Sequence, residues 1–147
     1  MSGAPGAAPG GTGHRTVPHT GDLAVEAWAP EREECVAEAV RGAVGGFAEI
    51  PPGAVRTERE YELADDTDER LLVSALEEMI FRAETAGELP ARVSVRRTGA
   101  GVRMRLAMVD SALVEQVGAV PKAVSLHGLR MTRETAGGWR CHVTLDV

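Results

Sequence analysis

The sequence predicts an α+β domain, a two-layer fold in which two helices cover one mostly antiparallel sheet of about six strands. Three observations support this class. Short segments alternate apolar and polar residues, two segments repeat apolar residues at helical spacing, and the second half of the chain lacks a helical pattern. With 147 residues, 44% of them hydrophobic, the chain has the size of one ordinary globular domain.

The first half of the chain contains both predicted helices. Residues 1–13 are rich in Gly, Ala and Pro and are expected to form a disordered leader before a single domain over 14–147. Alternation predicts a strand over 22–29, and proline suits the first turn of a helix that begins at Pro30 and carries an apolar stripe through Phe47.

A second strand and a second helix follow in the same order. The strand is expected over 54–64, with Val55, Tyr61 and Leu63 on its inner face. The helix is expected between an Asp or Thr cap after residue 64 and a stop at Gly87. The remaining residues predict a connector near 110–120 and strands over 89–97, 101–109, 122–134 and 139–147.

Composition excludes several classes of function. A formal net charge of −6 argues against direct binding of nucleic acid and suits a basic protein partner. No apolar run approaches the roughly 18 residues of a membrane span, and no signal peptide is present, so we expect a cytoplasmic protein. Cys35 and Cys141 fit no metal-binding spacing and are expected to be reduced packing residues.

The stretch "VPHTGDLAVEAWA" places Asp22 where a turn enters the first predicted strand. A carboxylate after Thr-Gly can hydrogen-bond its own backbone and stabilise the turn. It can also be one half of a binding site. The stretch alone leaves both interpretations open.

A second candidate group lies at the other end of the chain. Alternation in "WRCHVTLDV" assigns Cys141, Val143, Leu145 and Val147 to the core, so the side chain of Asp146 projects to the polar face. The carboxylate of Asp146 and the terminal carboxylate of Val147 would then lie a few ångströms apart. One interpretation is a solvated strand end. The other is a pair of anions neutralised by a cation.

These two ends would form one site if the 22–29 strand lay beside the last strand, which the pattern permits but does not require. Asp22, Asp146 and the Val147 carboxylate would then suit a hard cation such as calcium or magnesium. Participation of His19 would favour zinc or manganese. His127 fits a core or edge histidine better than a ligand, and Lys122 fits a solvated side chain unless it balances the carboxylates.

The segments "PHTGDLAVEAWA", "KAVSLHGL" and "GGWRCHVTLDV" together resemble the archease family over residues 14–147. The resemblance implies a non-catalytic protein cofactor that promotes guanylylation and multiple turnover of an RtcB-type RNA ligase in tRNA splicing. It also implies a calcium-type metal site at Asp22, Asp146 and Val147, with partner or supporting roles for His19, Lys122 and His127. The Gly21 and Ser125-Leu126 positions depart from the family pattern.

Two other functions stay open at this point. The same carboxylates could serve a small metal-dependent phosphohydrolase, although the sequence supplies no general base with a supporting partner. A chaperone-like module, such as a modulator of a tRNA methyltransferase, would need an exposed apolar patch.

Overall fold

The computed structural model describes residues 11–147 of the chain. This part contains nine strands, two α-helices and one short 3-10 helix. In chain order the elements are β1 (Gly13–His19), β2 (Asp22–Ala29), α1 (Arg32–Gly45), β3 (Ala48–Glu49), β4 (Thr57–Leu63), α2 (Asp68–Ala86), β5 (Glu88–Thr98), β6 (Gly101–Asp110), η1 (Ser111–Leu113), β7 (Glu115–Gln116), β8 (Ala123–Arg133) and β9 (Trp139–Asp146). The predicted α+β class and both helices are confirmed.

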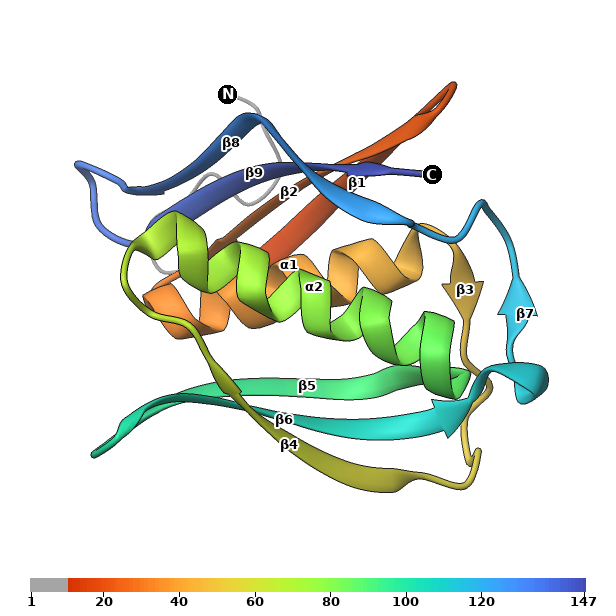
Figure 1. The fold of residues 1–147 in the computed structure, drawn as a ribbon. Coiled ribbons are helices and arrows are strands. Elements are labelled where there is room, and N and C mark those ends of the chain that lie inside the picture. Colours follow the sequence, from red (N-terminus) through yellow and green to blue (C-terminus); the bar gives the residue numbers. More distant parts are fainter. Residues whose placement is uncertain (1–10) are drawn as a thin grey trace.

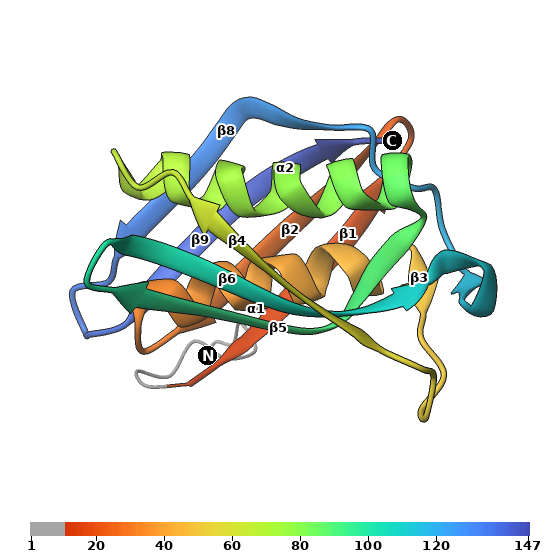
Figure 2. The same cartoon turned by 60° about the horizontal axis from the view of Figure 1, so that its bottom comes forward.

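The strands form separate sheets rather than the single predicted sheet. One sheet has the order β1-β2-β9-β8, another has the order β4-β6-β5, and β3 pairs with β7 in a short third sheet. All pairings are antiparallel. Figures 1 and 2 show α1 and α2 lying between the two larger sheets, so the described domain has three layers instead of two.

The reason for the third layer is visible in α1. The sequence shows one apolar stripe, but residues 35–40 and 42–44 of this helix are all buried. Small residues make this possible, because Ala37, Ala39, Gly42 and Ala43 let neighbouring strands approach the helix from both sides. The helix contacts β1, β2 and β9 of one sheet and β5 of the other.

Two strands far apart in the sequence lie side by side in the larger sheet. The first predicted strand, β2, pairs along its whole length with the last strand, β9 (Figure 1). The arrangement that the alternation pattern merely permitted is therefore the observed one. A strand that the pattern did not predict, β1, covers the other edge of β2 through a hairpin whose turn is Thr20-Gly21. Gly13, assigned to the leader by composition, begins β1, and residues 1–10 of that leader lie outside the described residues.

The second helix begins and ends where its capping residues predict. The Thr67 hydroxyl accepts a hydrogen bond from the Arg70 backbone N–H at 3.0 Å, and Gly87 follows the helix in the left-handed conformation with φ of 63°. These caps satisfy backbone groups that a helix end leaves unpaired. Helix α1 begins at Arg32 rather than Pro30. Its N-cap residue is Glu31, whose side chain makes no capping hydrogen bond.

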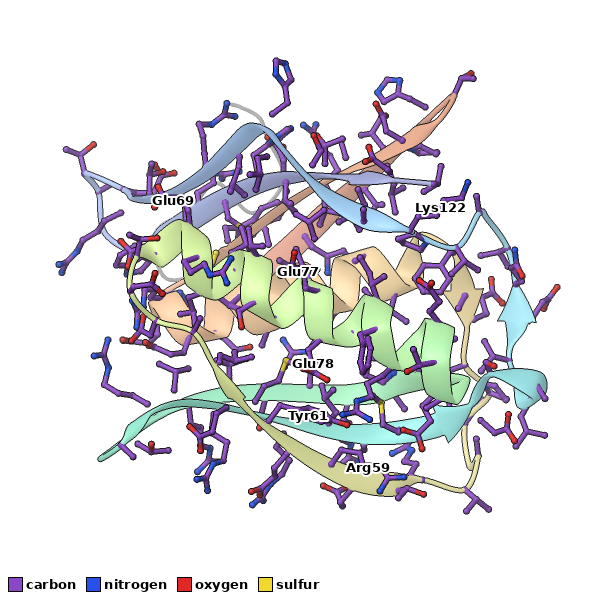
Figure 3. The ribbon with its side chains drawn as sticks, in the orientation of Figure 1. Arg59, Tyr61, Glu69, Glu77, Glu78 and Lys122 are labelled. Carbon is purple, nitrogen blue, oxygen red and sulfur yellow. The ribbon has the colours of Figure 1, made fainter. Side chains whose placement is uncertain are left out.

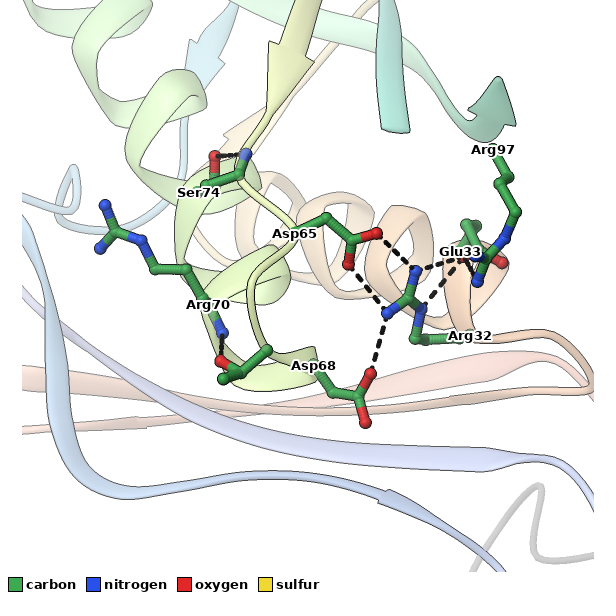
Figure 4. Close-up of polar contacts among 9 residues, drawn as sticks. Arg32, Glu33, Asp65, Asp68, Arg70, Ser74 and Arg97 are labelled. Carbon is green, nitrogen blue, oxygen red and sulfur yellow. Dashed lines mark hydrogen bonds and ion pairs between the residues drawn. The ribbon is translucent and has the colours of Figure 1, made fainter. Parts of the chain in front are cut away.

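A network of charged side chains centred on Arg32 joins the start of α1 to the segment that leads into α2 (Figure 4). The guanidinium donates to Asp68 at 2.8 Å, to Asp65 at 3.2 Å and to Glu33 at 2.8 and 3.0 Å. Burial alone would lower the pKa of Arg32, but these hydrogen bonds hold it above its ordinary value. Arg97 of β5 donates to the same oxygen of Glu33, at 3.1 Å, so the network also reaches the second sheet.

Both cysteines are free and buried, as predicted for packing residues. Cys35 of α1 lies against Cys141 of β9, and this contact together with burial raises the pKa of the Cys35 thiol. Neither helix among residues 11–147 is long and apolar enough to cross a membrane.

Candidate functional site

The larger sheet brings three of the predicted site residues into one row. At the end of the sheet where β9 finishes, His19 of β1 is opposite Asp22 of β2, and Asp22 is opposite Asp146 of β9. Residues directly opposite each other in an antiparallel pair project to the same face. Asp22 alternates with the buried Leu23 and Asp146 with the buried Leu145, so the row projects from the face that points away from the helices.

The two aspartates form the closer of the two kinds of cross-strand pair. The backbone N–H of Val147 donates to the Gly21 carbonyl at 3.1 Å. This bond joins the residues just outside the pair, so Asp22 and Asp146 are themselves a non-hydrogen-bonded pair. In such pairs the Cα atoms are about 4.5 Å apart and the side chains lie closest. The two carboxylates are thus neighbours because of the strand register.

Backbone hydrogen bonds fix the strand ends that carry the row. The Lys122 N–H donates to the Asp146 carbonyl at 2.7 Å, and the Val147 N–H holds the following residue against Gly21. The side chain of Val147 is half-buried and packs against the core. Gly21 has a φ of 83°, a conformation that glycine adopts without steric cost and that closes the two-residue turn. Asp22 and Asp146 therefore sit on a fixed backbone.

The charge of this site is uncompensated in the part of the chain that the structure describes. Over residues 11–147, neither Asp22 nor Asp146 has an ion-pair partner. The same residues contain no group of three or more His, Cys, Asp or Glu side chains placed to hold a metal ion. Two adjacent carboxylates can supply part of the oxygen shell of a hard cation, and backbone oxygens and water would have to supply the remainder.

The other predicted residues lie at different distances from the aspartate pair. Lys122 is exposed and immediately precedes Ala123, which is opposite Asp146 on β8. His127 is also exposed but lies four positions beyond Ala123, in the stretch between Ser125 and Arg130 where the pairing of β8 with β9 is interrupted. Its backbone N–H donates to the Ser125 hydroxyl at 3.2 Å. The structure thus places Lys122 beside the pair and His127 away from it.

The structure also reveals a surface that the strand patterns did not predict. A groove of about 470 Å³ runs between α2 and the start of β8, lined by Glu77, Phe81 and Glu84 on the helix and by Lys122 on the other side. Several large apolar side chains are exposed near the same end of the molecule, including Phe81 (53% exposed) and Leu113 (56%). The spacing of Glu77, Phe81 and Glu84 by four and three residues is the sequence signal for this surface, because it places them on one helical face.

Comparison with known proteins agrees with this fold. The model of the Archease protein family (MTH1598/TM1083) matches residues 14–147. Proteins named "Probable protein archease" from two strains of Mycobacterium tuberculosis, CDC 1551 / Oshkosh and H37Rv, are each 46% identical over 136 residues, which cover 92% of this chain and 75% of theirs.

Two solved structures share the fold. The solution structure of protein 1598 from Methanobacterium thermoautotrophicum superimposes with a TM-score of 0.66 at 20% identity, covering 92% of this chain and 99% of that one. The crystal structure of an archease from Thermotoga maritima, described as a possible chaperone, gives 0.64 at 20% identity, covering 90% and 96%. At 20% identity these two structures show the fold alone. The family follows from the family model that matches residues 14–147 and from the mycobacterial relatives. This chain belongs to the Archease protein family.

Proposed function

We propose that this protein is a non-catalytic accessory protein that promotes guanylylation and multiple turnover of an RtcB-type RNA ligase. It would act through a divalent cation, calcium in the first place, held by Asp22, Asp146 and a main-chain oxygen of Val147. The observation that carries the proposal is the register of β2 and β9, which sets the two carboxylates directly opposite each other at the sheet end. Membership of the archease family supports the choice of partner.

The geometry suggests a role in positioning rather than in bond making. The aspartates project from a fixed backbone on an exposed sheet end, where a partner can reach them without any rearrangement of the core. A cation held there would supply positive charge to nucleotide phosphates in the ligase. The residues of this chain would hold and orient that charge, which lowers the cost of bringing the reacting groups together.

Acidic composition supports the choice of a protein partner that binds RNA. A ligase that grips phosphates has a basic cleft, and a chain with a net charge of −6 is attracted to such a cleft over several ångströms. The uncompensated Asp22–Asp146 pair would be the part of this chain that enters it. His19 and Lys122 flank the pair, so their side chains would contact the same partner.

Guanylylation of the ligase, measured with and without this protein in calcium-containing buffer, tests the proposal. Wild-type protein should accelerate the reaction, and Asp22→Asn and Asp146→Asn should each reduce the maximal acceleration at least tenfold. Glu26→Gln is the matched control, because Glu26 projects from the same face of β2 and is paired with Arg15 at 2.7 Å. Acceleration that survives both aspartate changes would refute the metal site. Phosphate release by this protein alone would instead favour a phosphohydrolase.

A second candidate function is a chaperone-like module, for example one that modulates a tRNA methyltransferase. The exposed apolar side chains favour it, since Leu113, Val117 and Val120 project from one connector and are 41–56% exposed. A chaperone would suppress aggregation of its client independently of calcium. Loss of that activity on Leu113→Ser, together with no effect of Asp146→Asn, would select this function over ligase activation.

A further inference from the structure

The groove between α2 and the start of β8 has the features of a docking surface. Glu77, Phe81 and Glu84 follow one another by four and three residues, so they form a single stripe on α2. Figure 3 shows Glu77 on the side of α2 that faces β8, and Lys122 at the start of the chain segment that leads into β8. The stripe is the helix side of the groove, and Lys122, Ala123 and Val124 are the strand side.

Phe81 supplies an apolar anchor in this groove. Its side chain is 53% exposed, whereas its neighbour Ile80 is buried in the core. Arg82 places its guanidinium 5.4 Å from the centre of the Phe81 ring and 4.6 Å from the centre of Tyr61. The Arg82 guanidinium thus packs against both rings, but about half of the Phe81 side chain stays exposed to solvent. Exposed aromatic rings at such positions carry a large share of binding energy when a partner covers them.

The charges beside the ring define what can cover it. Glu78 is neutralised by Arg82, whose Nε donates to it at 3.0 Å. Within residues 11–147, Glu77 and Glu84 have no ion-pair partner, and the single lysine that lines the groove, Lys122, cannot neutralise both, so a ligand that buries them must bring cations of its own. Seven residues of helix separate the two carboxylates by roughly 10 Å. An occupant therefore needs two basic side chains about 10 Å apart, one on each side of an apolar one.

The groove ends next to the strand end that carries Asp146. Lys122 lines the groove, and its backbone N–H donates to the carbonyl of Asp146 at 2.7 Å. Because β8 is an edge strand of the larger sheet, a protein that covers Asp146 on the outer face can reach around Lys122 into the groove. We infer that the groove binds a basic segment of the ligase, in which two Lys or Arg side chains meet Glu77 and Glu84 and an apolar side chain covers Phe81. This inference rests on the proposed function for the identity of the partner.

Two readouts separate docking from activation. Binding of this protein to the purified ligase is measured by calorimetry, and guanylylation is measured over a titration of the protein. The variants are Phe81→Ser and the double charge reversal Glu77→Lys with Glu84→Lys. Glu69→Lys is the control, because it makes one of the two Glu-to-Lys exchanges of the double variant on α2 near the start of the helix, outside the groove (Figure 3). Thermal unfolding establishes that each variant is folded.

We expect both groove variants to raise the dissociation constant and the half-saturating concentration at least tenfold, with the maximal acceleration unchanged. Glu69→Lys should change the dissociation constant less than twofold. Added salt should weaken binding of the wild type more than binding of the double variant, because the ion pairs are screened. Wild-type affinity in both groove variants would overturn the inference. Tight binding that depends on the groove without any acceleration would overturn the proposed function and leave the docking surface standing. The absence of binding by the wild type would overturn both.

Discussion

Replacing Asp146 by asparagine should stabilise the metal-free protein and remove its response to calcium. The two carboxylates of the aspartate pair are neighbours in a non-hydrogen-bonded cross-strand pair, so their charges lie on the order of 5 Å apart. Asp146 is exposed, so the dielectric constant of water applies on that side. Two unit charges at this separation repel each other by about 0.8 kcal/mol. Removing one charge without changing the shape of the side chain removes this repulsion.

The sign of the effect reverses when a cation is bound. In a chelator, Asp146→Asn should raise the free energy of unfolding by about 0.8 kcal/mol, or roughly 2–3 °C in melting temperature for a domain of this size. Calcium at a hundredfold excess over its dissociation constant should stabilise the wild type by about 2.7 kcal/mol. The variant has lost a ligand and should gain far less, so it becomes the less stable protein in calcium.

Thermal unfolding followed by circular dichroism, in chelator and in calcium, measures both effects. Glu26→Gln serves again as the control, because it removes a carboxylate from the same face of β2 without touching the aspartate pair. It should respond to calcium like the wild type. A lower melting temperature of Asp146→Asn in chelator would show that the carboxylate is stabilising in the free protein. A calcium shift equal to that of the wild type would remove Asp146 from the ligand set. Either result refutes the reasoning.

Three further changes have defined outcomes. Adding two glycines after Val147 should weaken calcium binding at least tenfold in calorimetry compared with the 147-residue chain. A tag before residue 1 should leave calcium binding unchanged. Equal calcium affinities of the extended and the 147-residue chain would exclude Val147 as a ligand. Gly21→Ala should cost about 1 kcal/mol in urea unfolding, because φ is 83° there and no neighbouring atom restricts the new methyl group; no loss would mean that the turn relaxes. Arg32→Ala should lower the free energy of unfolding by about 2 kcal/mol at pH 7. Burial alone would raise the pKa of Glu33, but the hydrogen bonds from Arg32 lower it. The stabilisation by the Arg32–Glu33 pair is therefore present above roughly pH 4 and fades as the pH falls further. A cost of Arg32→Ala that is independent of pH would contradict this.

Local sequence features predict most of the helices and strands, but β1 and the start of β4 depart from the prediction. Thr67 and Gly87 mark the ends of α2 because a cap needs only neighbouring backbone groups. Strand β1 has no apolar alternation, since it is an edge strand that exists through its pairing with β2. Val55 was expected on the inner face of a strand over 54–64, but β4 begins at Thr57 and Val55 is 80% exposed.

The apolar stripe of α1 does not predict whether one sheet or two sheets cover the helix. A stripe shows which residues must be buried, but the small residues on the other side of α1 are compatible with either solvent or a second sheet. The segregation of seven of the nine described strands into two larger sheets determined that both sides are covered. The exposed Phe81 follows from the same arrangement, because β8 leaves the outer stripe of α2 open instead of covering it.

By itself, the sequence determined which residues face the core and which face solvent at the start of β2 and the end of β9, because side-chain direction alternates along a strand. It thereby placed Asp22 and Asp146 on polar faces, each with two interpretations. Only the tertiary structure decided that β2 pairs with β9 in the register that sets these carboxylates opposite each other. Register and strand order depend on contacts between segments more than a hundred residues apart, and no local pattern encodes them. The turn interpretation and the site interpretation of Asp22 thus describe one position: a strand entrance fixed by Gly21, with a second carboxylate beside it.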